Sequence, residues 1–192
     1  MKIYTRKGDD GTTGLWYGGR RAKSDRRIEA YGAVDEAISA LGVARAGCAN
    51  AEAEAAGDAA EIAADVLRLQ NELFVAGAEL AAAPEAADRL EDGVSRMTPE
   101  MVEWIETAID RYMDRVELPP KFVIPGGTPL SAQLDLARAT LRRAERRVVA
   151  LGEAGEAASA ALTTYVNRAA DLVWAMARFS DRPDPELFAG RG

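Results

Sequence analysis

The chain has 192 residues, a formal net charge of −7, only 6% aromatic residues and no histidine. Its length suits one sizeable core, and its acidic balance excludes a protein that binds nucleic acid or a membrane surface through a broad basic face. The lack of imidazole excludes Ser-His-Asp and Cys-His sites, HExxH zinc proteases and Glu-x-x-His di-iron bundles. Catalysis by positioning and charge stabilisation remains, with a hard metal ion or a borrowed cofactor.

The single cysteine, Cys48, cannot form an intrachain disulfide, and we interpret it as a small hydrophobe without chemistry. No run of the sequence approaches 18 apolar residues, and the first seven residues lack the apolar region of a signal peptide. We therefore expect a soluble, unexported protein of the reducing cytoplasm.

The first feature in chain order is a glycine-rich segment over residues 3–19. Its five glycines, together with aspartates and threonines, disfavour a regular helix or a central strand. Residues 5–14 combine basic side chains, hydroxyls and free backbone amides, as phosphate binding requires, but match neither a Walker A motif nor GxGxxG. Taken alone, this pattern is also typical of a turn without a ligand.

Three helices are predicted over residues 25–47, 59–82 and 99–116 from apolar residues that recur every three or four positions. Ser24 or Asp25 caps the first helix, and Pro84 ends the second. Thr98 and Pro99 supply a cap and a first-turn proline for the third.

Residues 118–127 are predicted to be extended or irregular, because prolines and paired glycines disfavour helix. Phe122 lies in this stiff segment, and from the residues alone we interpret it as a core aromatic. Thr128 and Pro129 open a fourth helix to about residue 151, and a fifth helix follows over residues 156–179. These elements predict an all-α protein, a five-helix antiparallel bundle with an irregular glycine-rich N-terminal segment.

The most unusual stretch is the arginine cluster, which we define as the five arginines of residues 138–147: Arg138, Arg142, Arg143, Arg146 and Arg147. On a helix, like charges four residues apart each cost about 0.2–0.5 kcal/mol. We therefore predict a clamp for a phosphate or carboxylate, which the planar guanidinium grips bidentately. A solvated basic face is the simpler reading.

Asp35 lies beside Tyr31 and Ile38 on the inward side of the first predicted helix. A buried carboxylate needs a partner, because burying an unpaired charge is costly, and the arginine cluster is the obvious supplier. Alternatively, Asp35 lies at the edge of the apolar stripe and reaches water.

Together, four blocks of the chain resemble the PduO-type ATP:cob(I)alamin adenosyltransferases, a family of corrinoid adenosyltransferases. The blocks are Thr5-Arg6-Lys7-Gly8-Asp9-Asp10-Gly11, Arg27-Ile28-Glu29-Ala30-Tyr31-Gly32-Ala33-Val34-Asp35-Glu36, Phe122-Val123-Ile124-Pro125-Gly126-Gly127 with the arginine cluster, and Tyr165-Val166-Asn167-Arg168. The resemblance implies one domain over residues 1–192, with a nucleotide-binding loop at 1–23 and a tail at 181–192. It also implies a homotrimer that binds ATP between neighbouring subunits.

The activity implied by the resemblance is transfer of the 5′-deoxyadenosyl group of ATP to the cobalt of cob(I)alamin, which gives adenosylcobalamin and triphosphate. ATP and cob(I)alamin are then substrates, Mg²⁺ assists, and an adenosylcobalamin-dependent enzyme accepts the product. No metal ligands are assigned. The alternative is a non-catalytic nucleotide or corrinoid sensor or delivery module, and a third reading is a purely structural acidic bundle.

The resemblance also assigns site residues, by matching motif positions. Those implied to hold the triphosphate are Thr5, Arg6, Lys7, Gly8, Thr13, Gly14 and Lys23. Those implied to complete the nucleotide site are Arg142, Arg143, Glu145, Arg146 and Asn167. Arg138 is implied to pair with Asp35 across a subunit interface or packing surface, and Phe122 to close the lower face of the corrin ring. The residues implied to be catalytic are therefore Asp35, Phe122, Arg138 and Arg142. Phe188 in the tail is left out, because its spacing does not clearly match that of the C-terminal aromatic of the family.

Overall fold

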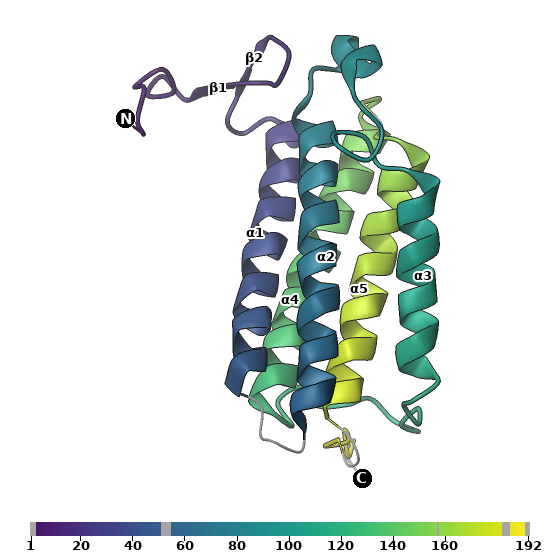
Figure 1. The fold of residues 1–192 in the computed structure, drawn as a ribbon. Coiled ribbons are helices and arrows are strands. Elements are labelled where there is room, and N and C mark those ends of the chain that lie inside the picture. Colours follow the sequence, from purple (N-terminus) through teal and green to yellow (C-terminus); the bar gives the residue numbers. More distant parts are fainter. Residues whose placement is uncertain (1–2, 51–54, 157, 182–184, 191–192) are drawn as a thin grey trace.

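The computed structural model describes residues 3–50, 55–156, 158–181 and 185–190. The described part contains a bundle of long helices, each antiparallel to the one before it (Figure 1). They are α1 (Arg26–Gly47), α2 (Ala56–Ala81), α3 (Pro99–Met113), α4 (Pro129–Glu153) and α5 (Ala160–Ser180). α1 packs against α2 and α4, α5 packs against α4, and α3 covers α5. The predicted all-α, five-helix architecture is confirmed.

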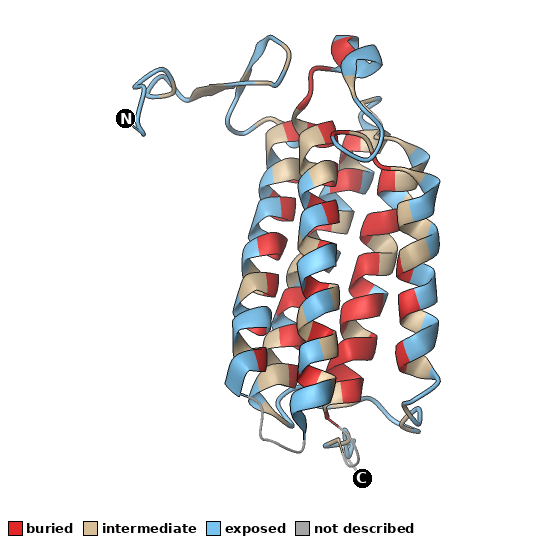
Figure 2. Ribbon diagram, in the orientation of Figure 1, coloured by how far each residue is buried: buried red, intermediate tan, exposed pale blue. Residues whose placement is uncertain are grey.

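The core is formed by the apolar stripes that the spacing predicts. Buried residues line the inner faces of the helices, and exposed residues line the outer faces (Figure 2). Representative side chains without solvent exposure are Val34, Leu41, Leu69, Leu73, Leu134, Leu141, Val166 and Val173. The helices therefore present a fixed outer surface on which site residues can be arranged.

Local capping sets where the helices begin. Asp25, one of the two predicted caps, accepts a hydrogen bond from the N–H of Arg27 at 2.8 Å. The Thr128 hydroxyl accepts from the Ser131 N–H and the Ser131 hydroxyl accepts from the Thr128 N–H, both at 3.0 Å, so the start of α4 is closed reciprocally. Thr98 occupies the N-cap position of α3 without such a side-chain bond.

Three predicted helix boundaries were displaced, and the first is the start of α2, which lies at Ala56 instead of residue 59. α3 ends at Met113, before the predicted residue 116. α5 begins at Ala160 instead of 156, because the Ser159 hydroxyl accepts from the Leu162 N–H at 3.1 Å and fixes the first turn there. Short 3-10 helices follow α1 and α2, namely η1 (Cys48–Asn50) and η3 (Pro84–Arg89). Cys48 is buried at the end of α1, as its interpretation as a small hydrophobe requires.

The N-terminal segment is more regular than predicted. It contains a short antiparallel hairpin of β1 (Thr12–Gly14) and β2 (Arg20–Ala22), in which Thr12 pairs with Ala22 and Gly14 with Arg20. Figure 1 shows the segment extending sideways from the N-terminal end of α1. Among the described helices, none is long and apolar enough to cross a membrane.

Candidate functional site

Two members of the arginine cluster face α1 and pair with its acidic residues. Arg143 forms an ion pair with Glu36 through Nη2, although no aligned hydrogen bond accompanies it within the described chain. Arg147 lies 3.5 Å from Glu29. These partners come from the predicted Arg27–Glu36 block, but sequence reasoning did not assign Glu29 or Glu36 to the arginines. These ion pairs therefore lower the net positive charge on this flank of the cluster.

Two other members, Arg142 and Arg146, lie on the exposed outer face of α4. Arg146 Nη1 donates to the backbone carbonyl of Arg142 at 3.0 Å. Within the described ranges, neither guanidinium has a carboxylate partner. This face is where α4 can accept an anionic ligand, because its charges are fixed by a packed helix and left uncompensated.

Glu145 and Asn167 were both predicted to belong to the nucleotide site, and the structure brings them together. Asn167 Nδ2 donates to Glu145 Oε1 at 2.6 Å, which links α5 to α4. Asn167 Oδ1 accepts from Arg168 at 2.7 Å, and Arg168 in turn pairs with Glu106 of α3 at 3.1 Å. Arg168 thus holds the Asn167 amide in one orientation, a role that its place in the Tyr165–Arg168 block did not reveal. Burial raises the pKa of Tyr165, so its phenol stays neutral.

Arg138 and Asp35 do not pair within one chain. Asp35 is exposed on α1, so its inward placement was wrong and the alternative edge position is confirmed. Arg138 instead bonds through Nε to Asp135, three residues earlier on α4, at 3.3 Å. Arg138 pairs with Asp135 instead of Asp35 because Asp135 lies one turn away on the same helix, so that no second helix has to approach. The expectation of a pair across a subunit interface stays a prediction.

Phe122 is 83% exposed, so its interpretation as a core aromatic was wrong. The tail folds back along its segment: the Phe188 N–H donates to the Phe122 carbonyl at 2.7 Å, and the Ile124 N–H donates to Glu186 at 2.8 Å. Phe188 is itself 52% exposed. The structure therefore brings Phe188, a second aromatic that the spacing did not assign to the site, to the segment that bears Phe122.

The N-terminal site residues share one segment, in the loop before the hairpin, in β1 and directly after β2. A turn closes where the Gly11 N–H donates to the Gly8 carbonyl at 3.2 Å, and Lys23 folds over it with its N–H bonded to Gly11 at 2.9 Å. A β-carbon on Gly8 would lie 3.1 Å from the Thr12 carbonyl and 3.4 Å from Lys23 Nζ, so only glycine fits there without displacement. The positions implied for the triphosphate that lie in this segment are Thr5, Arg6, Lys7, Gly8, Thr13, Gly14 and Lys23.

Arg20 ties this loop together, although the sequence did not single it out. Its guanidinium donates to the Lys7 carbonyl and, from Nε at 2.9 Å, to the Thr12 hydroxyl. The Thr12 hydroxyl and N–H donate to Asp10 at 2.7 and 2.9 Å, and these bonds lower the pKa of the Asp10 carboxyl. The loop is therefore ordered mainly by bonds among its own residues and with Arg20.

The two cationic regions do not meet within one chain. No hydrogen bond or ion pair in the described residues joins the segment 3–20 to the arginine cluster, and Figure 1 shows the segment directed away from the bundle. Among the described residues, its backbone hydrogen bonds to the bundle join Trp16 to Ala81 and Ala83, at the end of α2. Convergence on one polyphosphate would thus need a second copy of the chain.

No cluster of three or more acidic or thiol side chains suited to a metal ion occurs among the residues described. The arrangement is instead one of anion-binding groups: guanidiniums on α4 without carboxylate partners in the described ranges, a fixed amide on α5 and an N-terminal loop with basic side chains. Such groups can hold a nucleotide and stabilise a departing phosphate chain.

Comparison with known proteins agrees with this chemistry. The family model described as "Cobalamin adenosyltransferase" matches residues 3–180. A corrinoid adenosyltransferase of Bacillus subtilis is 40% identical over 178 residues, which are 93% of this chain and 86% of that protein. One from Citrobacter freundii is 41% identical over 180 residues, which are 94% and 95% of the two chains.

A solved structure is similar over the whole fold. It is a variant PduO-type ATP:corrinoid adenosyltransferase from Lactobacillus reuteri complexed with cobalamin and ATP, with a TM-score of 0.84 and 30% identity. The similarity covers 98% of this chain and 100% of that one. Since the family model spans nearly the whole sequence and these relatives are similar over nearly their whole lengths, the chain belongs to the cobalamin adenosyltransferase family.

Proposed function

We propose that this protein transfers the 5′-deoxyadenosyl group of ATP to the cobalt of cob(I)alamin, giving adenosylcobalamin and triphosphate. The observation that carries the proposal is the uncompensated pair of guanidiniums on the open face of α4, Arg142 and Arg146. Support comes from relatives named corrinoid adenosyltransferases and from the similar structure that was complexed with cobalamin and ATP.

The reaction is a nucleophilic displacement at carbon. The electron pair of Co(I) forms the cobalt–carbon bond, the bond from C5′ to the phosphate oxygen breaks, and its electrons leave with triphosphate. No proton moves, so no general base is required and a chain without histidine is sufficient. Arg142 stabilises the charge that develops on the departing oxygen, which is the kind of interaction that lowers a barrier most.

The other predicted residues bind and orient the nucleotide. Arg143 and Arg146 hold phosphate oxygens, while the fixed Glu145–Asn167 pair presents defined polar groups to the nucleoside. The N-terminal loop supplies Lys7, Lys23 and its neighbouring backbone amides to the triphosphate end. Mg²⁺, as the usual companion of ATP, would keep water and phosphate oxygens as its ligands.

Phe122 has the exposure that a contact with a large flat ring requires. We propose that it covers the lower face of the corrin and keeps water and basic ligands from the axial position of cobalt. Excluding axial donors makes the metal easier to reduce to the nucleophilic state.

The active assembly in this proposal is a homotrimer. In it, the N-terminal loop of one copy meets the open face of α4 on the next, which no single chain achieves. Asp35, exposed and without a partner in the described ranges, pairs with Arg138 of a neighbouring copy. The product then passes to an adenosylcobalamin-dependent enzyme in the cytoplasm.

The test is to incubate the protein with ATP, Mg²⁺ and chemically reduced cobalamin and to record the absorption spectrum. The proposal expects conversion to the adenosylcobalamin spectrum and one triphosphate per product. ATP-dependent thermal stabilisation without conversion would show a sensor or delivery module instead. If ATP causes no thermal stabilisation and no adenosylcobalamin forms, the protein would be a purely structural bundle.

A further inference from the structure

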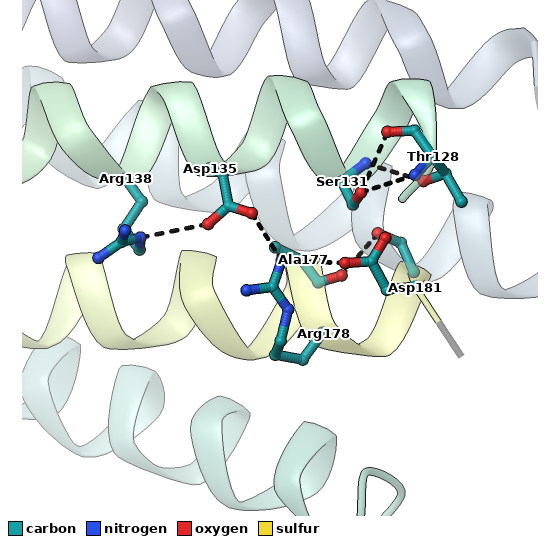
Figure 3. A network of polar contacts seen from close by, with 8 residues as sticks. Thr128, Ser131, Asp135, Arg138, Ala177, Arg178 and Asp181 are labelled. Carbon is teal, nitrogen blue, oxygen red and sulfur yellow. Dashed lines mark hydrogen bonds and ion pairs between the residues drawn. The ribbon is translucent and has the colours of Figure 1, made fainter. Parts of the chain in front are cut away.

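A buried network of charges connects α4 to the end of α5 (Figure 3). Arg178 Nη2 donates to Asp135 at 2.6 Å and to Asp181 at 3.0 Å. The three side chains are only 3%, 4% and 0% exposed, respectively. Two carboxylates thus share one buried guanidinium, and Arg138, which is 31% exposed, supplies the second positive charge at the surface.

Stability alone does not explain such a network. Removing ions from water is costly, and apolar residues of similar volume commonly give equal or greater stability. A buried network that persists at a functional site can instead fix the positions of the groups it touches.

At one end the network anchors Arg138. Asp135 uses one carboxylate oxygen for Arg178 and the other for Nε of Arg138. The Nε bond fixes the guanidinium plane, while its two terminal nitrogens have no recorded partner in the described part of the chain. Arg138 is consequently held with its two outer nitrogens left for a further acceptor.

At the other end the network abuts the turn between Phe122 and α4. Asp181 Oδ1 is buried without a hydrogen-bond partner within the described ranges, and a β-carbon on Gly127 would lie only 2.6 Å from it. Gly126, immediately before, has a φ of +119°. The Phe122 segment thus turns directly over Asp181, and any side chain at position 127 would collide with the carboxylate.

Asp181 also lies where α5 ends, at the root of the tail. The Asp181 N–H bonds to Ala177 and Arg178, and from residue 185 the tail runs beside the Phe122 segment. The same buried group therefore lies against Gly127 and at the end of α5, and it is linked through Arg178 and Asp135 to Arg138.

We propose that Asp135, Arg178 and Asp181 are positioning residues. They hold Arg138 and the Phe122 segment, residues 118–127, in fixed relative positions that suit the corrin substrate. The proposal rests on the proposed function. Because no bond from Arg142 or Asn167 to the network occurs among the described residues, the proposal predicts a selective effect on cobalamin binding and not on ATP binding.

The test replaces the whole network by apolar residues of similar size, in the variant Asp135→Leu/Arg178→Met/Asp181→Leu. This variant leaves no unpaired buried charge, so it is expected to fold. We expect the KM for cobalamin to rise about tenfold or more and the KM for ATP to stay within about threefold. Amide exchange at Ile124 and Phe188 should accelerate selectively, while core amides of α2 keep their protection.

The matched control is Tyr112→Phe, which removes a hydrogen bond of 2.7 Å to Asp65 between α3 and α2, outside the network. It should leave both KM values and the exchange at Ile124 unchanged. Unchanged kinetics and exchange in the triple variant, or equal changes in both KM values with general loss of protection, would overturn the positioning role. If the wild type makes no adenosylcobalamin, the proposed function fails, but the exchange measurement still tests whether the network holds the segment.

Discussion

The two basic regions of the molecule are held in opposite ways. α4 is anchored by side chains such as Leu134, Leu141 and Leu151, which have no exposed surface, so its arginines project from a rigid helix. The N-terminal loop is ordered by Arg20, Thr12 and a few turn bonds on an exposed segment. One half of the candidate site is therefore preorganised by the core, and the other depends on weak local bonds.

This difference suggests separate roles for the two regions, in the chemical step and in the binding of ATP. Groups that stabilise developing charge must be fixed before the reaction, because reorganisation during the step costs free energy. Groups that only enclose the ligand can be loosely held, since part of the binding energy can order them. The α4 face should therefore determine the rate, and the loop should determine the affinity for ATP.

The largest expected effect comes from Arg142→Ala. The change should lower kcat by about 100- to 1000-fold, the usual cost of removing one group that stabilises transition-state charge. The melting temperature should not change, because Arg142 is exposed and has no carboxylate partner among the described residues. Steady-state formation of adenosylcobalamin and calorimetry would measure the two quantities.

Arg147→Ala is the control for that variant, since Arg147 lies one turn further along α4 but faces Glu29. It should retain most of the activity. Equal losses for the two variants would mean that the arginine cluster acts as a general positive field and that the open face has no special role.

Arg20→Ala should affect the other region. Without this guanidinium, Lys7 and Thr12 lose their shared donor and the loop becomes less ordered. The KM for ATP should rise about tenfold, the cost of ordering one or two more side chains on binding, while kcat at saturating ATP stays near the wild-type value. A fall in kcat with unchanged KM would contradict the assignment of ATP binding to the loop and of the chemical step to the α4 face.

The sequence was sufficient for the features that depend on local patterns. Apolar spacing located the helices, and Thr128-Pro129 located the start of α4, because capping and amphipathicity are decided within one or two turns. The four motif blocks pointed to the family that the comparisons then showed.

The features that were missed depend on distant parts of the chain. Phe122 is exposed because its segment pairs with the tail, more than 60 residues later, instead of entering the core. Arg178, in the last turn of α5, would be expected at the surface, yet it is buried by two carboxylates that come from α4 and from the residue after α5. No local pattern reveals such partners.

Glu36→Gln, next to α4, should change the KM for ATP by a smaller factor than Arg20→Ala and in the opposite direction. The substitution removes the carboxylate that pairs with Arg143, so the freed guanidinium should attract phosphate more strongly. The KM for ATP should fall about twofold to fivefold, and stability should change by less than about 1 kcal/mol, because the pair is exposed. An increase in KM would show that Glu36 itself supports the nucleotide site.

The smallest expected effect is a pH dependence confined to the N-terminal loop. Donation from the Thr12 hydroxyl and N–H lowers the pKa of Asp10, so the ionised carboxylate favours the ordered loop. Its contribution is complete above the unfolded pKa of about 3.9 and is lost as the pH falls through the lower folded value. The Thr12 amide resonance should therefore shift with a midpoint below that of an ordinary aspartate, while α4 resonances remain unaffected. Asp10→Asn should abolish the transition, whereas a midpoint at or above the ordinary value would show that these bonds do not order the loop in solution.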